Sequence, residues 1–407
     1  MNENDVVIVS AVRTPFGRFD GLLKSTPSID LGVLALQEVV RRIDLDPGLV
    51  DEVYYGTCIP AEYALFTNVP ARQITLLAGF PDDNLSLTID RACCSSMTAL
   101  RLGFRAIKAG EADVVIASGA ENMGNTPLIA EAAKARWGSR LGHIQLEDIL
   151  FELGYGRKGF APVAADAGEV AVEVGISREM QDEWAAQSHA RWFAAYQAAK
   201  FRIGEELMAV EIPQRRGEPL VLDRDESPRQ DVSLEKMARL PTIYGSPTVT
   251  AGNAPGLNAG ASAMVIMRRA RAASLGLKPL ATIEACQAAA GAPKYMARVP
   301  AQAIHKMLAR TGLSLDDVDL IEINEAFAAV TLVSLHDLAG GDPAALQVLQ
   351  AKTNVNGGAI AIGHPVGASG ARITMTLMYE LMRRGGGSGV AAICGGLSQG
   401  EAILVKV

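Results

Sequence analysis

Apolar runs of strand length alternate with segments of helical period along most of this chain, and this alternation restricts the fold more than any other feature of the sequence. The runs 53–57, 85–89 and 114–118 are typical of buried strands, whereas 31–43 and 95–108 carry apolar residues at helical spacing. Such alternation predicts α/β units built on a largely parallel sheet. A chain of 407 residues is long enough for two or three domains.

The second half of the chain repeats the pattern of the first. Residues 45–55 read LDPGLVDEVYY and residues 313–323 read LSLDDVDLIEI, so that a short acidic turn precedes a strand in both. The same offset of about 268 residues carries Cys93 close to His364. Acidic turns before strands are common, but several matches in one register favour a duplication. We therefore predict two similar α/β halves.

Residues 124–247, between the two halves, have a different character. Trp184, Trp192 and Tyr196 lie on helical segments, and 215–229 is charged and rich in Pro and Asp. Long insertions of this kind often cover a site. The predicted domains are an N-terminal half of residues 1–123 plus 248–275, a loop domain of residues 124–247 and a C-terminal half of residues 276–407.

Charge and cysteine content argue against several classes of protein. The net charge is −7 and no run of Lys and Arg forms a basic stripe, which argues against a nucleic-acid partner. We find no signal-peptide pattern and no apolar segment long enough to span a bilayer. Five cysteines, an odd number in a large chain, favour reduced thiols in a cytoplasmic setting. Neither Cys-x-x-Cys nor His-x-x-x-His spacing occurs, so we predict no metal site.

Two adjacent cysteines lie where a predicted strand passes into a helix, in the segment TIDRACCSSM of residues 88–97. Free N–H groups and the positive end of the helix dipole are expected to lower the pKa of the Cys93 thiol. A thiolate is a good nucleophile and a good leaving group, as covalent acyl transfer requires. The alternative is that Cys93 and Cys94 merely pack well as small buried residues.

A glycine-rich segment, NGGAIAIGHPVGASG at residues 356–370, confines His364 between Gly363 and Pro365. A phosphate-binding loop is the rival interpretation, but the Gly-Lys-Ser/Thr ending is absent. The confined setting just ahead of a helix favours a general base or an oxyanion donor at His364.

Two further segments carry polar groups at predicted strand ends. Cys394 is followed by two glycines, and a thiolate there could remove a proton from a carbon acid. Backbone N–H groups of Gly396 and Cys93 could stabilise the resulting enolate. Asn324 follows the predicted strand 320–323, where a polar residue either caps the next helix or holds a water against a substrate.

Together these segments closely resemble the thiolase superfamily, specifically its degradative and biosynthetic thiolases. The motifs are Cys93-Cys94-Ser95, Asn324-Glu325-Ala326-Phe327, Gly363-His364-Pro365 and Cys394-Gly395-Gly396. Family-like stretches at 11–17, 119–123 and 248–254 extend the resemblance over essentially the whole chain. It implies a thiolase-like duplicated α/β/α/β/α layered fold, in which each half is a mixed sheet between helices and the halves share a central helical layer. It also implies an inserted loop domain over the CoA, and a homodimer or homotetramer.

The resemblance also implies an activity in fatty acid metabolism, namely reversible Claisen condensation of two acyl-CoAs or thiolytic cleavage of a 3-oxoacyl-CoA. An acetyl-CoA C-acetyltransferase or C-acyltransferase is implied. Cys93 would form the acyl-enzyme while His364 takes its proton, and Cys394 would deprotonate the second acyl-CoA. His364 and a water held by Asn324 would form one oxyanion hole, and the N–H groups of Cys93 and Gly396 the other. CoA is then substrate and product, with no metal or redox cofactor.

By the same resemblance, six residues should line the pocket for CoA and the acyl group: Arg229, Leu240, Ala251, Pro255, Met296 and Phe327. The chain also departs from the family pattern near this pocket. Pro255 replaces a usual Ser, Ala259 a common Asp, Asp90 a usual Asn, Pro162-Val163 a frequent His-Met, and Cys94 a Gly, Ala or Ser. These departures leave the CoA contacts and the acyl-chain preference open.

Two alternatives stay in play. A decarboxylating ketosynthase has the same fold, but such enzymes lack an equivalent of Cys394 and use two His, or His and Asn. A non-catalytic lipid- or acyl-CoA-binding member of the fold would usually have lost catalytic residues, and none is lost here. The sequence does not set the physiological direction of the reaction.

Overall fold

The computed structural model describes residues 2–64, 68–138, 140–152 and 159–407. Ten of the described strands form one sheet in the order β12-β13-β14-β11-β1-β10-β5-β3-β4, with β2 paired to β10. Their bounds are β1 Val6–Arg13, β2 Gly17–Arg18, β3 Glu52–Gly56, β4 Leu85–Ile89, β5 Val114–Asn122, β10 Asn258–Arg268, β11 Ala281–Ala290, β12 Leu320–Ile323, β13 Ser388–Gly395 and β14 Gln399–Lys406.

The sheet is mixed, as the architecture expected from the family resemblance has it, whereas the largely parallel sheet predicted from the alternation of strands and helices alone is wrong. Among the described strands, β3 pairs in parallel with β4 and β5, and β12 with β13, while the other neighbours run antiparallel. The reason is local at β13 and β14, which are joined by a short turn in which Leu397 and Ser398 adopt positive φ. A turn this short can join only antiparallel strands.

The sheet consists of two similar halves joined where β1 pairs with β11. Outward from that pairing the order is β1-β10-β5-β3-β4 in one half and β11-β14-β13-β12 in the other. Beyond β12, Thr353 forms a parallel bridge with Ile321, at the position that β4 occupies in the first half. The repeated acidic segments are the 3₁₀ turns Pro47–Leu49 and Leu315–Asp317, which lead into β3 and β12. The predicted duplication is therefore confirmed.

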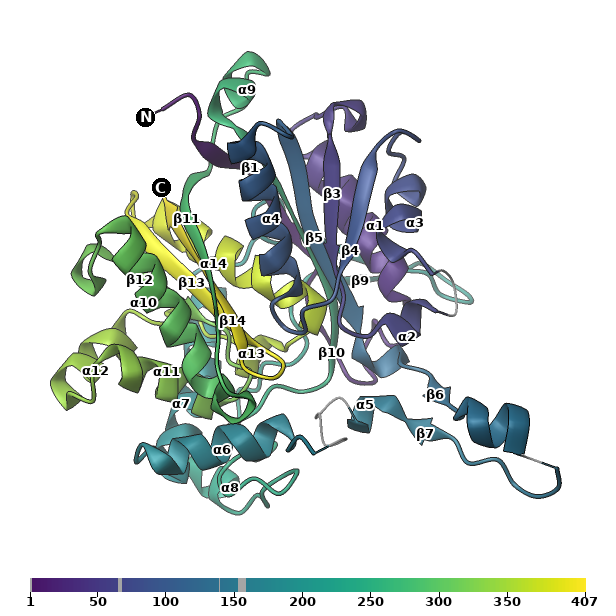
Figure 1. The fold of residues 1–407 in the computed structure, drawn as a ribbon, viewed down its shortest axis with the longest axis vertical. Helices are drawn as coiled ribbons and strands as arrows, with labels where there is room; N and C mark the ends of the chain where they lie inside the picture. The colour runs from purple at the N-terminus through teal and green to yellow at the C-terminus, as the bar shows by residue number, and fades with distance from the viewer. Residues whose placement is uncertain (1, 65–67, 139, 153–158) are drawn as a thin grey trace.

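Helices cover both outer faces of the sheet and fill the space between its halves (Figure 1). The helices are α1 Ser28–Arg41, α2 Pro60–Tyr63, α3 Pro70–Leu77, α4 Ser95–Ala109, α5 Ile149–Glu152, α6 Val163–Glu173, α7 Arg178–Gln197, α8 Leu234–Ala238, α9 Arg269–Ser274, α10 Val299–Thr311, α11 Ala328–Leu338, α12 Pro343–Ala351, α13 Ala359–Ile362 and α14 Ser369–Arg383.

Five layers follow from the alternation of side chains along the strands. Val7 and Val9 of β1 belong to a buried cluster with α1 and α3, whereas Val6 and Ile8 belong to a cluster with α4 and α14. A third cluster joins the opposite outer face of the sheet to α10 and α11. Since α4 contacts α14 and strands of both halves, these two helices form the central layer. The predicted α/β/α/β/α layering is thus observed.

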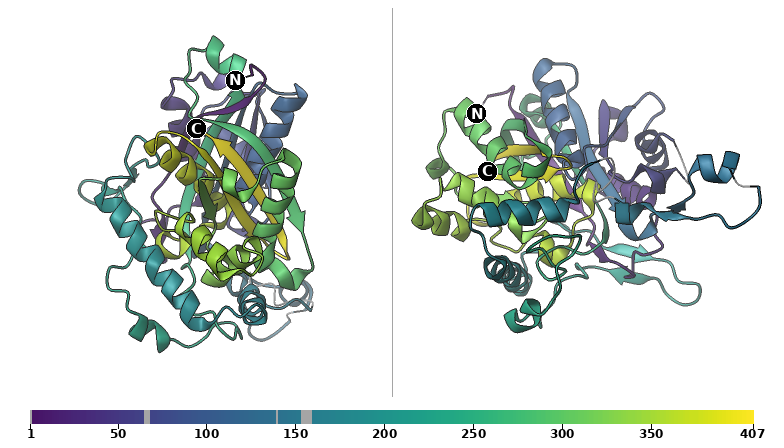
Figure 2. Two further views of the ribbon diagram at one scale, coloured as in Figure 1. Left: turned by 90° about the vertical axis from the view of Figure 1, so that its left-hand side faces the viewer. Right: turned by 60° about the horizontal axis from the view of Figure 1, so that its bottom comes forward.

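The insertion between β5 and β10 lies along the base of both halves in Figure 1. Helices α6 and α7 share the buried cluster of α10 and α11, to which Ala167 and Trp184 contribute. The short strands β8 (Val210–Ile212) and β9 (Leu220–Leu222) form a ribbon of their own. Strands β6 (Leu128–Ile129) and β7 (Glu147–Asp148) pair in an arm that extends away from the body (Figure 2). The predicted domain boundaries stay a prediction.

The prediction of a buried strand at residues 85–89 has the right bounds but the wrong environment. β4 is the end strand of the sheet, and its side chains Leu85 and Leu87 are 64% and 48% exposed. An end strand pairs on one side only. An apolar run in the sequence predicts a strand, but it does not indicate whether other residues of the same chain bury that strand.

The two halves approach each other closely beside the ends of β3 and β5. A Cβ atom placed on Gly119 of β5 would lie 2.2 Å from the carbonyl oxygen of Gly367 and 2.8 Å from that of Gly56. Only glycine permits backbones to come this near. The loop between His364 and α14 is therefore held directly against the N-terminal half.

We expect Gly119→Ala to destabilise the protein by about 1–3 kcal/mol, because the new methyl group overlaps backbone atoms that cannot move aside. Urea unfolding measures the difference. Gly48→Ala is the matched control, since Gly48 is exposed and a Cβ there would contact only the Asp46 carboxylate, at 3.3 Å. Equal unfolding free energies for the two variants would contradict the predicted close approach.

Candidate active site

Cys93 lies in the turn that joins β4 to α4. Ala92, just before it, has φ +49°, a left-handed conformation that costs a non-glycine residue about 1 kcal/mol. Two side chains hold this turn: Asp90 Oδ1 accepts the Ala92 N–H at 3.1 Å, and Ser95 Oγ donates to the Ala92 carbonyl at 2.6 Å. The side-chain oxygen of an Asn could accept the same N–H, so this hydrogen bond does not depend on whether Asp or Asn occupies position 90.

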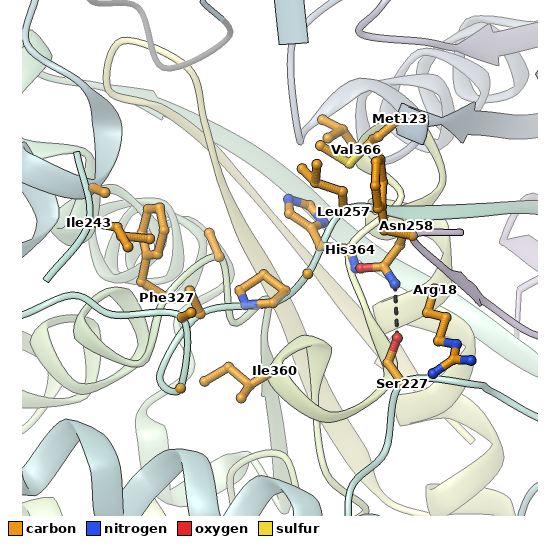
Figure 3. A pocket seen from close by; sticks show the side chains of 18 of the residues that line it. Arg18, Met123, Ser227, Ile243, Leu257, Asn258, Phe327, Ile360, His364 and Val366 are labelled. Carbon is orange, nitrogen blue, oxygen red and sulfur yellow. Dashed lines mark hydrogen bonds between the residues drawn. The ribbon is translucent and has the colours of Figure 1, made fainter. Parts of the chain in front are cut away.

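His364 follows α13 and is held by hydrogen bonds on its backbone and on its ring. Its N–H donates to Asn258 Oδ1 at 3.0 Å, and Asn258 in turn donates to Ser227 Oγ (Figure 3). Ring atom Nδ1 lies 2.6 Å from Ser369 Oγ, whose own hydroxyl donates to the Pro365 carbonyl. Because the Ser369 proton is already used, Nδ1 carries the ring proton and Nε2 has a free lone pair.

The Nε2 atom of His364 lies 3.1 Å from Cys93 Sγ. Burial raises the pKa of the Cys93 thiol to about 12, and the negative charge of Glu121 adds to the effect. Burial also lowers the pKa of His364 to about 3, assisted by the positive charge of Arg372. The resting pair is therefore a neutral thiol and a neutral imidazole. The prediction of a lowered pKa at Cys93 is wrong, because loss of hydration outweighs the field of the α4 N-terminus.

Asn324 and Cys394 lie at the carboxyl ends of the neighbouring strands β12 and β13. Asn324 comes directly after β12, is fully buried, and places Nδ2 3.5 Å from His364 Nε2. Cys394 is the penultimate residue of β13 and is also fully buried. Burial raises its pKa well above the usual value, and negative charge at Cys93 raises it further, so the two thiols are near enough to interact.

A cavity of about 850 Å³ has Cys93, His364 and Gly396 in its wall, whereas Asn324 and Cys394 are fully buried and are not part of that wall. In the close view, Phe327 and Ile243 lie at one side of the cavity, and His364 lies with Leu257 and Val366 at the other (Figure 3). The cavity wall includes all six residues expected to bind CoA and the acyl group: Arg229, Leu240, Ala251, Pro255, Met296 and Phe327. That they bind CoA stays a prediction.

Two comparisons decide the family. The family models for the thiolase N-terminal domain and the thiolase C-terminal domain match residues 6–270 and 277–407. The chain belongs to the thiolase family. An acetyl-CoA acetyltransferase of Pseudomonas aeruginosa is 40% identical over 403 residues, covering 98% of this thiolase and 99% of the relative.

Solved structures of thiolases superpose on this one along their whole length. The crystal structure of the Bacillus anthracis acetyl-CoA acetyltransferase has a TM-score of 0.91 and 38% identity, covering 99% of this chain and 98% of that one. Human mitochondrial 3-ketoacyl-CoA thiolase in complex with CoA has a TM-score of 0.90 and 37% identity, with the same coverage. Thiolases are acyltransferases, so the predicted enzyme class is confirmed, and these matches give no support to a ketosynthase.

The departures from the family pattern lie in different places in this thiolase. Pro162, Val163 and Pro255 are part of the cavity wall. Ala259 is buried within β10, and Cys94 is buried with Sγ 3.7 Å from the carbonyl oxygen of Ile393. The first three can therefore alter what the cavity accepts, whereas Cys94 has its side chain in the central layer.

Sequence reasoning missed several groups that support the site of this thiolase. Ser369 and Asn258 hold His364, Arg372 donates to Asn324 Oδ1 at 3.3 Å, and Cys58 lies in the cavity wall. Arg372 had a signal that was overlooked, since it is a charged residue on an apolar helical segment directly after the Gly-His-Pro motif. The other three carry no pattern that distinguishes them from ordinary polar residues.

Among the described residues, no three His, Cys, Asp or Glu side chains are grouped so that they could hold a metal ion. Of the helices that the structure describes, none has the length and apolar content needed to cross a membrane. The expectation that the thiolase needs no metal or redox cofactor stays a prediction.

We expect the alkylation of Cys93 by iodoacetamide to speed up about tenfold per pH unit between pH 6 and 9. The thiol pKa lies above this range, so the reactive thiolate grows in proportion to hydroxide. Mass spectrometry of the Cys93 peptide measures the rate, with Cys93→Ser to assign the peptide. A plateau reached below pH 7 would instead indicate a thiolate–imidazolium pair at rest.

Proposed function

We propose that this thiolase catalyses the reversible Claisen condensation of two acyl-CoAs and the thiolytic cleavage of 3-oxoacyl-CoA, as an acetyl-CoA C-acetyltransferase or C-acyltransferase. The observation that carries the proposal is the Cys93 thiol, 3.1 Å from an unprotonated imidazole nitrogen at the wall of a large cavity, with a second thiol nearby. One thiol can carry an acyl group while the other moves a proton at carbon.

In the cleavage direction the reaction starts from the protonation states that burial favours. Cys93 Sγ attacks the 3-oxo carbon while its proton passes to His364 Nε2. The C2–C3 bond then breaks, leaving the acyl group on Cys93 and releasing acetyl-CoA as its enolate. The enolate carbon takes the proton of Cys394, whose raised pKa keeps that proton available. The imidazolium proton then neutralises the Cys394 thiolate.

The second half of the cycle transfers the acyl group to CoA. The thiol sulfur of CoA attacks the acyl-enzyme carbonyl, the bond to Cys93 Sγ breaks, and the CoA proton passes by way of His364 to Cys93. Backbone N–H groups of Cys93 and Gly396 are proposed to bind the oxygen that becomes negative in this step. The enolate oxygen is proposed to face His364 and a water held by Asn324. Condensation is the same sequence in reverse.

Acyl-CoA and CoA are the proposed ligands, and no further cofactor is proposed. Apolar side chains such as Met296 and Phe327 suit an acyl chain and the pantetheine arm, and Arg229 supplies positive charge for phosphate groups. Pro255 provides no hydroxyl to the pantetheine. The five cysteines are free thiols, which supports a reducing, cytoplasmic compartment.

Cys93→Ala is expected to lower thiolysis of acetoacetyl-CoA and of longer or branched 3-oxoacyl-CoAs by about 10³–10⁴-fold, because no acyl-enzyme can form. Cys394→Ala is expected to keep acyl-enzyme formation from acetyl-CoA, which moves no proton at carbon, and to lose carbon–carbon cleavage of 3-oxoacyl-CoA. The loss of absorbance of the 3-oxoacyl thioester measures turnover. Cys286→Ala, a third free cysteine in a separate groove lined by α4 and α10, is the control and should be unaffected. Full turnover by Cys394→Ala would favour the decarboxylating ketosynthase.

We further propose that the thiolase is a homo-oligomer in which β4 pairs with β4 of a second copy. β4 pairs only with β3 among the described strands, so its other edge offers free backbone groups beside the exposed Leu85 and Leu87. The arm offers a second apolar surface, where Trp137 and Leu141 are 75% and 100% exposed. Two such surfaces on one chain support a tetramer built from dimers.

Leu87→Glu is expected to shift the oligomer toward a smaller species, because a carboxylate at the proposed contact would be desolvated. Size-exclusion chromatography with light scattering measures the mass. Val348→Glu is the matched control, since Val348 is 64% exposed on α12, away from β4, and should leave the mass unchanged. A monomeric wild-type protein would contradict the oligomer.

A further inference from the structure

Arg13 and Arg372 are the arginines with no exposed surface in the described part of the chain. Arg13 has carboxylate partners on every nitrogen: Nε lies 2.7 Å from Glu206, and Nη1 and Nη2 lie 2.7 and 3.0 Å from the two oxygens of Asp225. Its charge is thus neutralised where it lies. A buried arginine paired in this way is explained by packing of the insertion against β1.

Arg372 is not neutralised in the same way. Its Nη2 donates to the amide oxygen of Asn324 at 3.3 Å, and Nη1 is 3.9 Å from Glu322 Oε2. Within the described residues, Nε and Nη1 have no hydrogen-bond partner. Burial raises the pKa of Glu322, and the positive charge of Arg372 offsets this only in part. The negative charges of Glu206 and Glu325 also act on Arg372, but neither carboxylate is hydrogen-bonded to it. A buried cation with so few partners lowers stability, and stability therefore does not explain it.

The position of Arg372 connects it to the catalytic groups. Helix α14 begins at Ser369, which binds His364 Nδ1, and Arg372 lies three residues later on the same helix face. Asn324, the partner of Arg372, lies with its other amide atom 3.5 Å from His364 Nε2. One helix end therefore contacts the ring of His364 and the amide of Asn324 at the same time.

We propose that Arg372 is a positioning residue that fixes the Asn324 amide with its NH₂ group toward His364 Nε2, and that its buried positive charge stabilises the enolate oxygen bound beside His364. The inference rests on the proposed function. Arginine has only donors, so it binds the Asn324 oxygen and excludes the flipped amide, in which two donors would face each other. The NH₂ group of Asn324 is then left to donate on the side of His364.

The buried charge of Arg372 acts on the groups of the active site. The positive charge of Arg372 contributes to the lowered pKa of His364, so its field reaches the site. The same field favours negative charge on a substrate oxygen bound beside Asn324 and His364. In a buried site a fixed charge acts more strongly than it does in water.

The test separates acylation from enolate formation. Arg372→Met keeps the length of the side chain and removes its charge and donors. Acyl-enzyme formation from acetyl-CoA, followed as the mass of the Cys93 peptide, should stay within about fivefold of wild type. Exchange of the acetyl-CoA α-hydrogens in D₂O and thiolysis should each fall about 10²–10³-fold, a loss typical of removing one oxyanion donor, with KM little changed. Arg372→Lys should recover part of the loss.

Arg13→Met is the matched control. It removes the other fully buried arginine, and should lower the melting temperature while leaving acylation and exchange unchanged per folded enzyme. Equal losses of acylation and exchange in Arg372→Met, or a lowered melting temperature alone, would overturn the proposal. If Arg372→Met does not fold, the same comparison in Arg372→Lys decides. Failure of the proposed function would give a different result, because Cys93→Ala would then keep its thiolysis activity.

Discussion

The buried carboxyl group of Glu121 joins the two halves of the thiolase at the point where both supply reactive groups. It accepts the N–H of Gly367 from the C-terminal half at 3.0 Å, and those of Cys58 and Ile59 from the N-terminal half at 2.8 and 3.1 Å. The 3.1 Å contact between Cys93 and His364 crosses the same boundary, so it exists only when the halves are joined. Donors from two halves on one buried carboxyl resist relative movement, because breaking any of these bonds leaves a polar group unsatisfied.

The duplication explains why reactive side chains gather at one place. In both halves the parallel strands end at the same edge of the sheet, and polar or thiol side chains follow those ends. Cys93 comes after β4, Asn324 after β12, and Cys394 at the end of β13. In open α/β sheets the carboxyl ends of the strands are the usual place for ligands. Joining two such sheets brings two of these edges together, which is how one cavity receives groups from both halves.

Much of the fold and the positions of the reactive residues could be predicted from the sequence. The strands at 85–89 and 320–323 have the predicted bounds, because short apolar runs between turns reveal strands directly. The protonation of Cys93 was predicted wrongly, since a sequence shows that a helix begins there but not how much water is lost. Arg372 was missed for a related reason. Its role depends on being poorly paired, and the pairing of a charge is a property of the fold.

The pairing of β1 with β11 makes one continuous sheet of the two halves and has a mechanical consequence. A hinge between the halves would have to break the hydrogen bonds between these strands. Access to the cavity therefore has to come from the part of its wall that the insertion provides, through residues such as Val163 and Leu240. Thiolases on this plan can change the size of the group they admit by altering that wall alone. Such changes leave the spacing of the reacting atoms unaltered. Substrate selectivity can therefore evolve without a change in the catalytic residues.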